Sequence, residues 1–192
     1  MKFVKILAVA LLMMAGTAQA GGYTSLELSN EEKRSSGDDS VKYGVVVGVK
    51  AAGGMDYSLK VDASQAKIGD GDLSNGVELR AKKSFAGITD YDIKPYLGVR
   101  VGQKIKSDED FGHYAVDYGI KFPIIGNVVY LDLGGRYRNA FDTVNEFKSN
   151  RGHALVSWNL TKKDTVGVRY SQAYGDTSEE KNAWRLSYTR GF

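Results

Sequence analysis

The last ten residues, 183–192, alternate between large apolar side chains and small or polar ones, with Arg190 as the exception. Trp184, Leu186, Tyr188 and Phe192 would share one face of a strand, because successive side chains of a strand point to opposite sides. A soluble sheet that ended in such a strand would leave a bare apolar edge open to other chains. A closed barrel in lipid avoids this, because lipid solvates the apolar face and the first strand pairs with the last.

The same period of two continues from residue 22 to the end, and no stretch shows the 3.6-residue period of a helix. We expect about ten strands of about ten residues, the length that a tilted strand needs to cross a bilayer. The sequence therefore predicts an all-β, antiparallel up-and-down transmembrane barrel. Eight strands are the alternative if the first strand or the one containing Pro95 is irregular, and Pro95 should delay regular pairing there. The expected strands are 23–30, 41–50, 55–63, 76–83, 92–103, 113–121, 128–138, 152–160, 164–173 and 183–192.

The connections between these strands alternate in length. The first, third, fifth, seventh and ninth are long and polar, whereas the second, fourth, sixth and eighth are shorter. Outer-membrane barrels have this asymmetry, with long loops outside the cell and short turns in the periplasm. An even number of strands then leaves both termini in the periplasm.

Charge distribution predicts which face of the strands meets lipid. One face carries lysines and arginines together with fewer acids, and the other carries almost no charge apart from Arg190. A soluble barrel would place its charges outside and its apolar side chains inside. Aromatic residues of the apolar face fall near strand ends, which predicts the two aromatic girdles of a membrane barrel. The predicted girdle consists of Tyr43, Tyr57, Tyr114, Tyr118, Tyr137, Trp158, Tyr170 and Trp184.

The first 20 residues have the order of an export signal. A positively charged start precedes a short apolar run at 6–14, and residues 18–20 have the A-x-A pattern of a cleavage site. We expect residues 1–20 to be a cleaved signal peptide and 21–192 to form the barrel. The chain has no cysteine, so no disulfide can stabilise it. The formal net charge of +3 is too small to indicate nucleic acid as a partner.

The export signal, the ending and the run KPYLGVRVG at 94–102 resemble the small outer-membrane β-barrel proteins of Gram-negative bacteria, a group that includes opacity-type surface proteins. The ending resembles the assembly signal of such barrels, with Tyr188 and Phe192 in the signal positions, but it departs from the pattern at Arg190. The resemblance implies outer-membrane lipid, lipopolysaccharide, the barrel assembly machinery and periplasmic chaperones as partners, and a monomer as the expected state. Such families include adhesins, resistance factors, lipid enzymes and narrow channels, so the resemblance does not select one function.

The polar face allows two interpretations of the lumen. Its charges could form an ion-pair network that fills the barrel, leaving the surface loops to serve envelope integrity or surface recognition. Alternatively, they could line a narrow porin-like channel whose excess of cations would favour anions. Inward glycines would make room for long side chains in either case. The candidate lumen residues are Lys42, Glu78, Arg80, Arg100, Asp117, Asp132, Arg136, Arg169 and Arg185.

Catalytic and metal-binding patterns are weak. His113 and His153 are predicted to face inward at the outer rim, but no nucleophile or acid stands at a defined spacing from either. The stretch 70–76 resembles a calcium loop only in part, because the last EF-hand ligand position falls on Ala81 instead of a glutamate. We therefore expect no enzymatic activity, no metal and no cofactor.

Overall fold

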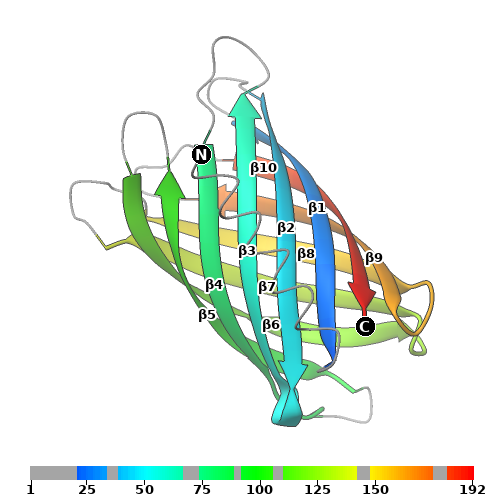
Figure 1. Ribbon diagram of the computed structural model, residues 1–192. Helices are drawn as coiled ribbons and strands as arrows, with labels where there is room; N and C mark the ends of the chain where they lie inside the picture. Colours follow the sequence, from blue (N-terminus) through cyan, green and yellow to red (C-terminus); the bar gives the residue numbers. More distant parts are fainter. Residues whose placement is uncertain are drawn as a thin grey trace.

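The computed structural model describes residues 21–33, 39–66, 74–88, 92–105, 110–141, 148–174 and 181–192. These residues form a closed barrel of ten antiparallel strands, each paired with its neighbours in the sequence (Figure 1). The predicted all-β, up-and-down architecture is confirmed, with ten strands and not eight. The expected signal peptide, 1–20, lies outside the described residues. No helix in the described part of the chain is long and apolar enough to cross a membrane.

Nine strands are longer than the sequence pattern predicts, because pairing continues past their alternating core, whereas the fifth strand keeps its predicted length and lies two residues later. Their bounds are β1 (Gly22–Lys33), β2 (Asp39–Ala51), β3 (Met55–Ala66), β4 (Ser74–Ser84), β5 (Lys94–Ile105), β6 (Asp110–Ile125), β7 (Val129–Ala140), β8 (Ser149–Asn159), β9 (Asp164–Tyr174) and β10 (Lys181–Gly191). A short 3-10 turn, η1 (Ala52–Gly54), joins β2 to β3.

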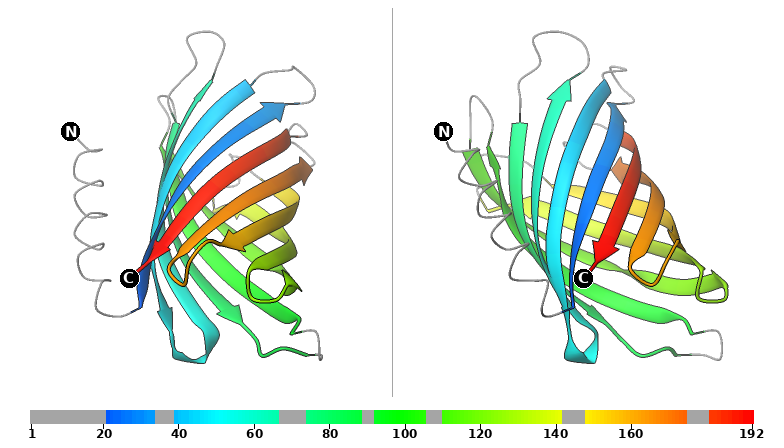
Figure 2. Two further views of the ribbon diagram at one scale, coloured as in Figure 1. Left: turned by 90° about the vertical axis from the view of Figure 1, so that its right-hand side faces the viewer. Right: turned by 45° about the vertical axis from the view of Figure 1, so that its right-hand side comes forward.

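Closure joins the two ends of the chain. Strand β10 pairs with β1 from Tyr23 opposite Gly191 to Lys33 opposite Lys181. Beyond the last pair, the amide of Phe192 donates a 3.0 Å hydrogen bond to the carbonyl of Gly22. The two further views in Figure 2 show β1 and β10 side by side and all strands tilted relative to the barrel axis. The final strand therefore closes the barrel as predicted.

Two predicted boundaries near prolines are wrong. Pairing with β6 begins at Lys94 and includes Pro95, although the sequence predicts that Pro95 delays it. A proline near the start of a strand loses a donor but keeps its carbonyl, and on the β4 side the carbonyl of Pro95 accepts from the amide of Phe85 at 2.9 Å. Strand β6 also continues through Pro123 to Ile125, with a register shift there, where the sequence pattern predicts a turn. The chain turns only at 126–128, where Gly126 has a φ of 47°.

Connections 52–54, 85–93, 126–128 and 160–163 mark one end of the barrel, called here the turn end. Turn 126–128 and the turn before Asp164 lie there, as does Phe192, since Asn159 bonds to Val128 and Gly191 bonds to Lys163. The opposite end, called the loop end, carries connections that include 34–38, 67–73, 106–109, 142–147 and 175–180, which lie outside the described residues. The predicted alternation in length is wrong at the fourth connection, because 85–93 is longer than 34–38 and 106–109.

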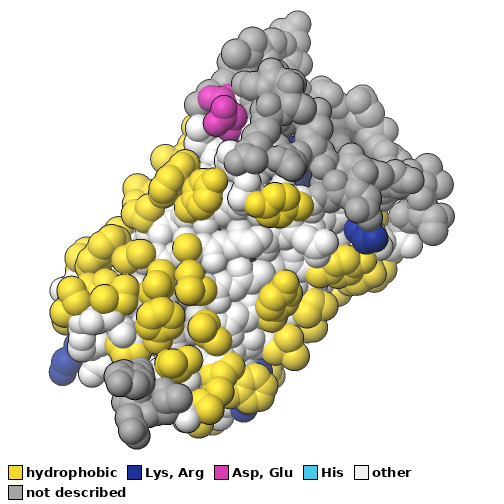
Figure 3. Space-filling model, turned by 180° about the vertical axis from the view of Figure 1, so that it is seen from behind, with side chains coloured by type: hydrophobic (Ala, Val, Ile, Leu, Met, Phe, Trp, Pro, Cys, Tyr) yellow, Lys and Arg dark blue, Asp and Glu magenta, His cyan; other side chains and the backbone are white. Residues whose placement is uncertain are grey.

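The wall of the barrel is apolar outside and polar inside. Leu79, Val99 and Trp184 point outward and are 57%, 55% and 59% exposed. Glu31, Lys60 and other charged side chains point inward and are buried. Figure 3 shows hydrophobic side chains spread over the wall of one face of the molecule, with charged groups near its edges. Apolar side chains outside and polar ones inside are the reverse of the arrangement in a soluble protein, and a lipid environment requires this reversal.

Candidate functional site: the barrel lumen

All nine predicted lumen residues point into the barrel, because the register of the strands places them on the inner face with the buried charges. They lie on seven strands: Lys42 on β2, Glu78 and Arg80 on β4, Arg100 on β5, Asp117 on β6, Asp132 and Arg136 on β7, Arg169 on β9 and Arg185 on β10. Placement does not decide whether these groups fill the lumen or line a channel, so their role stays a prediction.

The central cluster joins four strands through two carboxylates. Glu78 lies 2.9 Å from an Nη of Arg80 and 3.2 Å from an Nη of Arg100. Asp117 forms an ion pair with the Nε of Arg100 and a 2.8 Å pair with the Nε of Arg136. Arg100 therefore lies between two carboxylates from opposite sides of its own strand, and all five side chains are largely buried.

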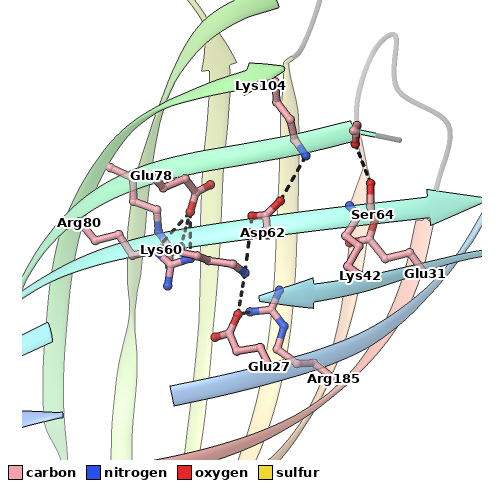
Figure 4. A network of polar contacts seen from close by, with 12 residues as sticks. Glu27, Glu31, Lys42, Lys60, Asp62, Ser64, Glu78, Arg80, Lys104 and Arg185 are labelled. Atoms are coloured by element: carbon pink, nitrogen blue, oxygen red, sulfur yellow. Dashed lines mark hydrogen bonds and ion pairs between the residues drawn. The ribbon is translucent and has the colours of Figure 1, made fainter. Parts of the chain in front are cut away.

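The seam cluster ties the last strand to the first. Glu27 accepts from Lys60 at 2.6 Å and lies 3.0 Å from an Nη of Arg185. Asp62 lies 3.5 Å from Lys104 and 3.9 Å from Lys60, so the pairs continue along the inner wall (Figure 4). Ion pairs thus reinforce the backbone pairing at the seam between β10 and β1.

A third cluster lies toward the loop end and crosses the lumen. Glu31 of β1 accepts from Lys42 at 2.5 Å and from Arg151 of β8 at 3.1 Å. Strands β1 and β8 are not neighbours, since β10 and β9 lie between them in the barrel. The Glu31–Arg151 pair therefore joins separated parts of the inner wall.

Tyr96 is the principal lumen residue that the candidate set lacks. Its hydroxyl donates to Asp132 at 2.8 Å and lies 3.3 Å from Nε2 of His153, while the same nitrogen lies 3.1 Å from Asp132. A Cβ on Gly119 would lie 2.5 Å from this hydroxyl, and one on Gly134 would also overlap it. Gly119 and Gly134 pair with each other on neighbouring strands, and both face inward. This pair of glycines is the feature of the sequence that could have indicated a large side chain lying across the two strands.

Both histidines lie deeper than predicted. His113 is only 1% exposed, with Nε2 3.3 Å from Glu78, and His153 lines an internal cavity. They lie inside the barrel and not at its outer rim, because β6 and β8 begin several residues before them. Within the described residues, no group of three or more histidines and acids could hold a metal ion. The calcium-like stretch is only partly described, since 70–73 lie outside.

The cavity occupies the turn-side half of the lumen and has a volume of about 140 Å³. Arginines 80, 100, 169 and 185 line it, together with Tyr23 and Tyr96. Lys82 also lines it, and its ammonium lies over the ring of Tyr96, 5.1 Å from the centroid. We call this space the turn-side cavity.

Lysines gather at the turn end of the inner wall. Lys50 lies over Tyr23 at 5.8 Å, and Lys121 lies over Tyr130 at 4.4 Å, each measured to the ring centroid. Among the described residues, Lys50, Lys82 and Lys121 have no carboxylate within ion-pair distance. The turn-side mouth is therefore more basic than the clusters above it.

The outer face bears the predicted aromatic residues. Tyr43, Tyr57, Tyr118, Trp158 and Trp184 are exposed on the wall, and Tyr170 packs on Trp184 with ring centroids 4.9 Å apart. Tyr114 and Tyr137 lie beside each other with centroids 6.4 Å apart. Their role as two aromatic girdles stays a prediction.

Arg190, the one charge on the apolar face, has a local partner. Its guanidinium lies 3.5 Å from Asp164, which also accepts a 2.6 Å hydrogen bond from the hydroxyl of Tyr188. The pair lies at the turn end, next to the C terminus, and Arg190 remains mostly exposed. A long basic side chain can keep its head at the polar headgroups in this position.

Comparison with protein-family models and with curated protein sequences finds no match to this chain. Solved structures do match. An outer membrane channel from Pseudomonas putida F1 aligns over 90% of this chain and 96% of its own, with a TM-score of 0.58 and 9% identity. The β domain of the Bordetella autotransporter BrkA aligns over 90% and 99%, with a TM-score of 0.54 and 12% identity.

The NanC porin aligns over 86% of this chain and 98% of its own, with a TM-score of 0.54 and 10% identity. At these identities the likeness shows the fold alone. The chain thus has the fold of Gram-negative outer-membrane β-barrels, as the sequence resemblance predicts, and its neighbours include both channels and an autotransporter domain.

Proposed function

We propose that this chain is a non-enzymatic integral protein of the cell outer membrane, that ion pairs close its lumen, and that its surface loops serve envelope integrity or surface recognition. The apolar outer wall supports the membrane location, because only lipid solvates such a surface around a closed barrel. The shared fold with outer-membrane barrels supports the same location.

The observation that carries the closed lumen is the Glu31–Arg151 pair, which joins strands that are not neighbours. The Glu31 side chain is only 6% exposed. Buried charges are tolerated when they are paired and hydrogen-bonded, so a network of this kind can replace water inside a narrow barrel. The central and seam clusters extend the same pairing along the inner wall.

Single-channel recording in planar bilayers tests the closed lumen. The refolded barrel should insert without steady conductance at either polarity. An empty detergent preparation is the negative control, and circular dichroism together with heat-dependent gel mobility shows that the inserted barrel is folded. Steady, anion-selective current from the folded protein would overturn the proposal in favour of the channel.

A role in envelope integrity has its own test in cells. A strain without the chain should become more sensitive to large hydrophobic antibiotics, and the full chain should restore resistance. A chain in which residues 142–147 are replaced by a glycine–serine segment should fail to restore it. If the sensitivity of the deletion strain is unchanged, a role in envelope integrity is ruled out, and surface recognition is left as the proposed role of the loops.

A narrow anion channel is the second candidate, favoured by the excess of cations on the inner wall and by the turn-side cavity. The residues that would carry selectivity are Arg80, Arg100, Arg136, Arg169 and Arg185. If current is observed, replacing them with glutamine should shift the reversal potential toward cations in a salt gradient. An unchanged reversal potential would rule these arginines out as the selectivity residues.

A further inference from the structure

We propose that the turn-side cavity binds a small oxyanion, with inorganic phosphate as the test case, and that Arg169 and Lys82 are its cationic ligands. The inference goes beyond the proposed function, because a closed lumen and a conducting one could each hold such an ion. Three properties of the cavity support it: an unpaired guanidinium, a basic approach and a matching volume.

Arg169 differs from the other arginines that line the cavity. Arg80, Arg100 and Arg185 each have a carboxylate oxygen within 3.2 Å. The Nε of Arg169 is buried and without a hydrogen-bond partner, and the guanidinium forms no ion pair with any described residue. A buried guanidinium without an anion is unfavourable, so an anion bound beside it would be stabilised.

The carboxylates nearest this guanidinium are already engaged. Glu27 is held by Lys60 at 2.6 Å and by Arg185 at 3.0 Å. Asp132 accepts the hydroxyl of Tyr96 at 2.8 Å. In each acid these contacts use a single oxygen, Oε2 of Glu27 and Oδ1 of Asp132, and neither acid lies within ion-pair distance of the Arg169 guanidinium. An external anion is therefore the partner that leaves the rest of the network intact.

Lys82 supplies a second positive charge and marks the direction of entry. Its ammonium lies over Tyr96 and has no acidic partner among the described residues, as is true of Lys50 and Lys121 beside it at the turn end. Asp56 also lines the cavity and accepts the hydroxyl of Tyr23 at 2.8 Å, so the three lysines outnumber this acid at the mouth. An excess of positive charge around a narrow mouth raises the local concentration of anions. An anion would thus approach from the turn side.

The volume and the donors suit a small oxyanion. About 140 Å³ accommodates a phosphate-sized ion with a few waters, given about 30 Å³ for each water in the liquid. It is too small for a peptide or an oligonucleotide. The planar fork of an arginine matches two oxygens of one phosphate or carboxylate, which a spherical halide cannot offer. Ser58 also lines the cavity and adds a hydroxyl donor.

Isothermal titration of the refolded barrel in a maltoside detergent, at low ionic strength, tests the site with inorganic phosphate. We expect saturable binding near one ion per barrel, weakened at least tenfold by Arg169→Gln and by Lys82→Gln. Arg190→Gln is the matched control, because it removes an exposed arginine on the outer face and should leave binding unchanged. Chloride at the same concentration should compete poorly.

Three results would overturn the inference: no saturable binding by the folded wild-type barrel, equal affinity in Arg169→Gln, or equal binding of chloride and phosphate. If Arg169→Gln fails to refold, two other variants decide: Arg169→Lys, which keeps the charge at the cavity, and Lys82→Gln, which keeps most of the bulk. Binding is read without current, so its failure is distinguishable from the appearance of conductance, which would overturn the closed lumen instead.

Discussion

The hydroxyl of Tyr96 on β5 reaches Asp132 on β7, 2.8 Å away, across the intervening strand β6. It can do so because the inner positions that it passes are Gly119 and Gly134. A ring laid along the inner wall thereby connects three strands with one side chain. The contact therefore requires glycine at both inner positions, because a Cβ at either one would overlap the Tyr96 hydroxyl.

Gly119→Ala should destabilise the barrel. The new Cβ would lie 2.5 Å from both the Tyr96 hydroxyl and the backbone carbonyl of Leu133, and the carbonyl cannot move away easily. Overpacking of this kind costs about 1–3 kcal/mol. Urea unfolding of the barrel in lipid vesicles, followed by tryptophan fluorescence, measures the change. Gly152→Ala is the control, because no atom lies within 4 Å of its Cβ, and equal effects of the two variants would contradict this packing.

Asp117→Asn should destabilise the barrel more strongly than a charge change at the rim. It leaves Arg100 without one of its two carboxylates and Arg136 without its ion pair in the central cluster. Removing one partner of a buried pair costs about 3–5 kcal/mol. Asp164→Asn is the comparison, since it breaks an exposed pair with Arg190 and should change the unfolding midpoint little. A small effect at Asp117 would show that water reaches the cluster.

Arg151→Ala should make the lumen leak. The change removes the contact from β8 to Glu31 while leaving the Lys42–Glu31 pair on neighbouring strands. We expect brief conductance events in planar bilayers that the wild-type protein lacks. Lys104→Ala serves as the control, because the contact it removes, to Asp62, spans a shorter stretch of the wall. Silent recordings from Arg151→Ala would mean that other contacts close the lumen.

Deletion of Phe192 should reduce assembly into the outer membrane. The residue contributes the last hydrogen bond of the seam, to Gly22, and an outward ring that is 44% exposed. Membrane fractions and heat-dependent gel mobility measure the folded fraction in cells. Ile88→Ser, an exposed apolar residue in a connection, is the control and should assemble normally. Equal yields of the two variants would remove Phe192 from the assembly signal.

Much of the fold follows from the sequence because side-chain alternation in a membrane barrel is set by two solvents. Lipid on one side and a polar lumen on the other impose a period of two on every strand, so Val45 and Lys42 could be placed on opposite faces without coordinates. The closing strand was predictable for the same reason. Its partner is β1, since a closed barrel leaves no other edge to pair.

The parts that could not be predicted depend on distances between strands that are far apart in the sequence. The reach of Arg151 to Glu31 depends on the diameter and stagger of the barrel, which alternation does not encode. The lack of a partner at Arg169 depends on which carboxylates form ion pairs with the neighbouring cations instead. The extension of β6 past Pro123 depends on a local register shift, so the proline alone indicated a turn.

The seam between β1 and β10 also sets the order of events in the life of the chain. The side chain of Thr189 bonds to Ser25 across 164 positions of sequence, so these contacts can form only after the whole barrel segment has been made and delivered. Until then every partial sheet has two open edges, each able to pair with a foreign strand. The time between synthesis and closure is thus the period in which the protein is most vulnerable to aggregation, however stable the finished barrel is.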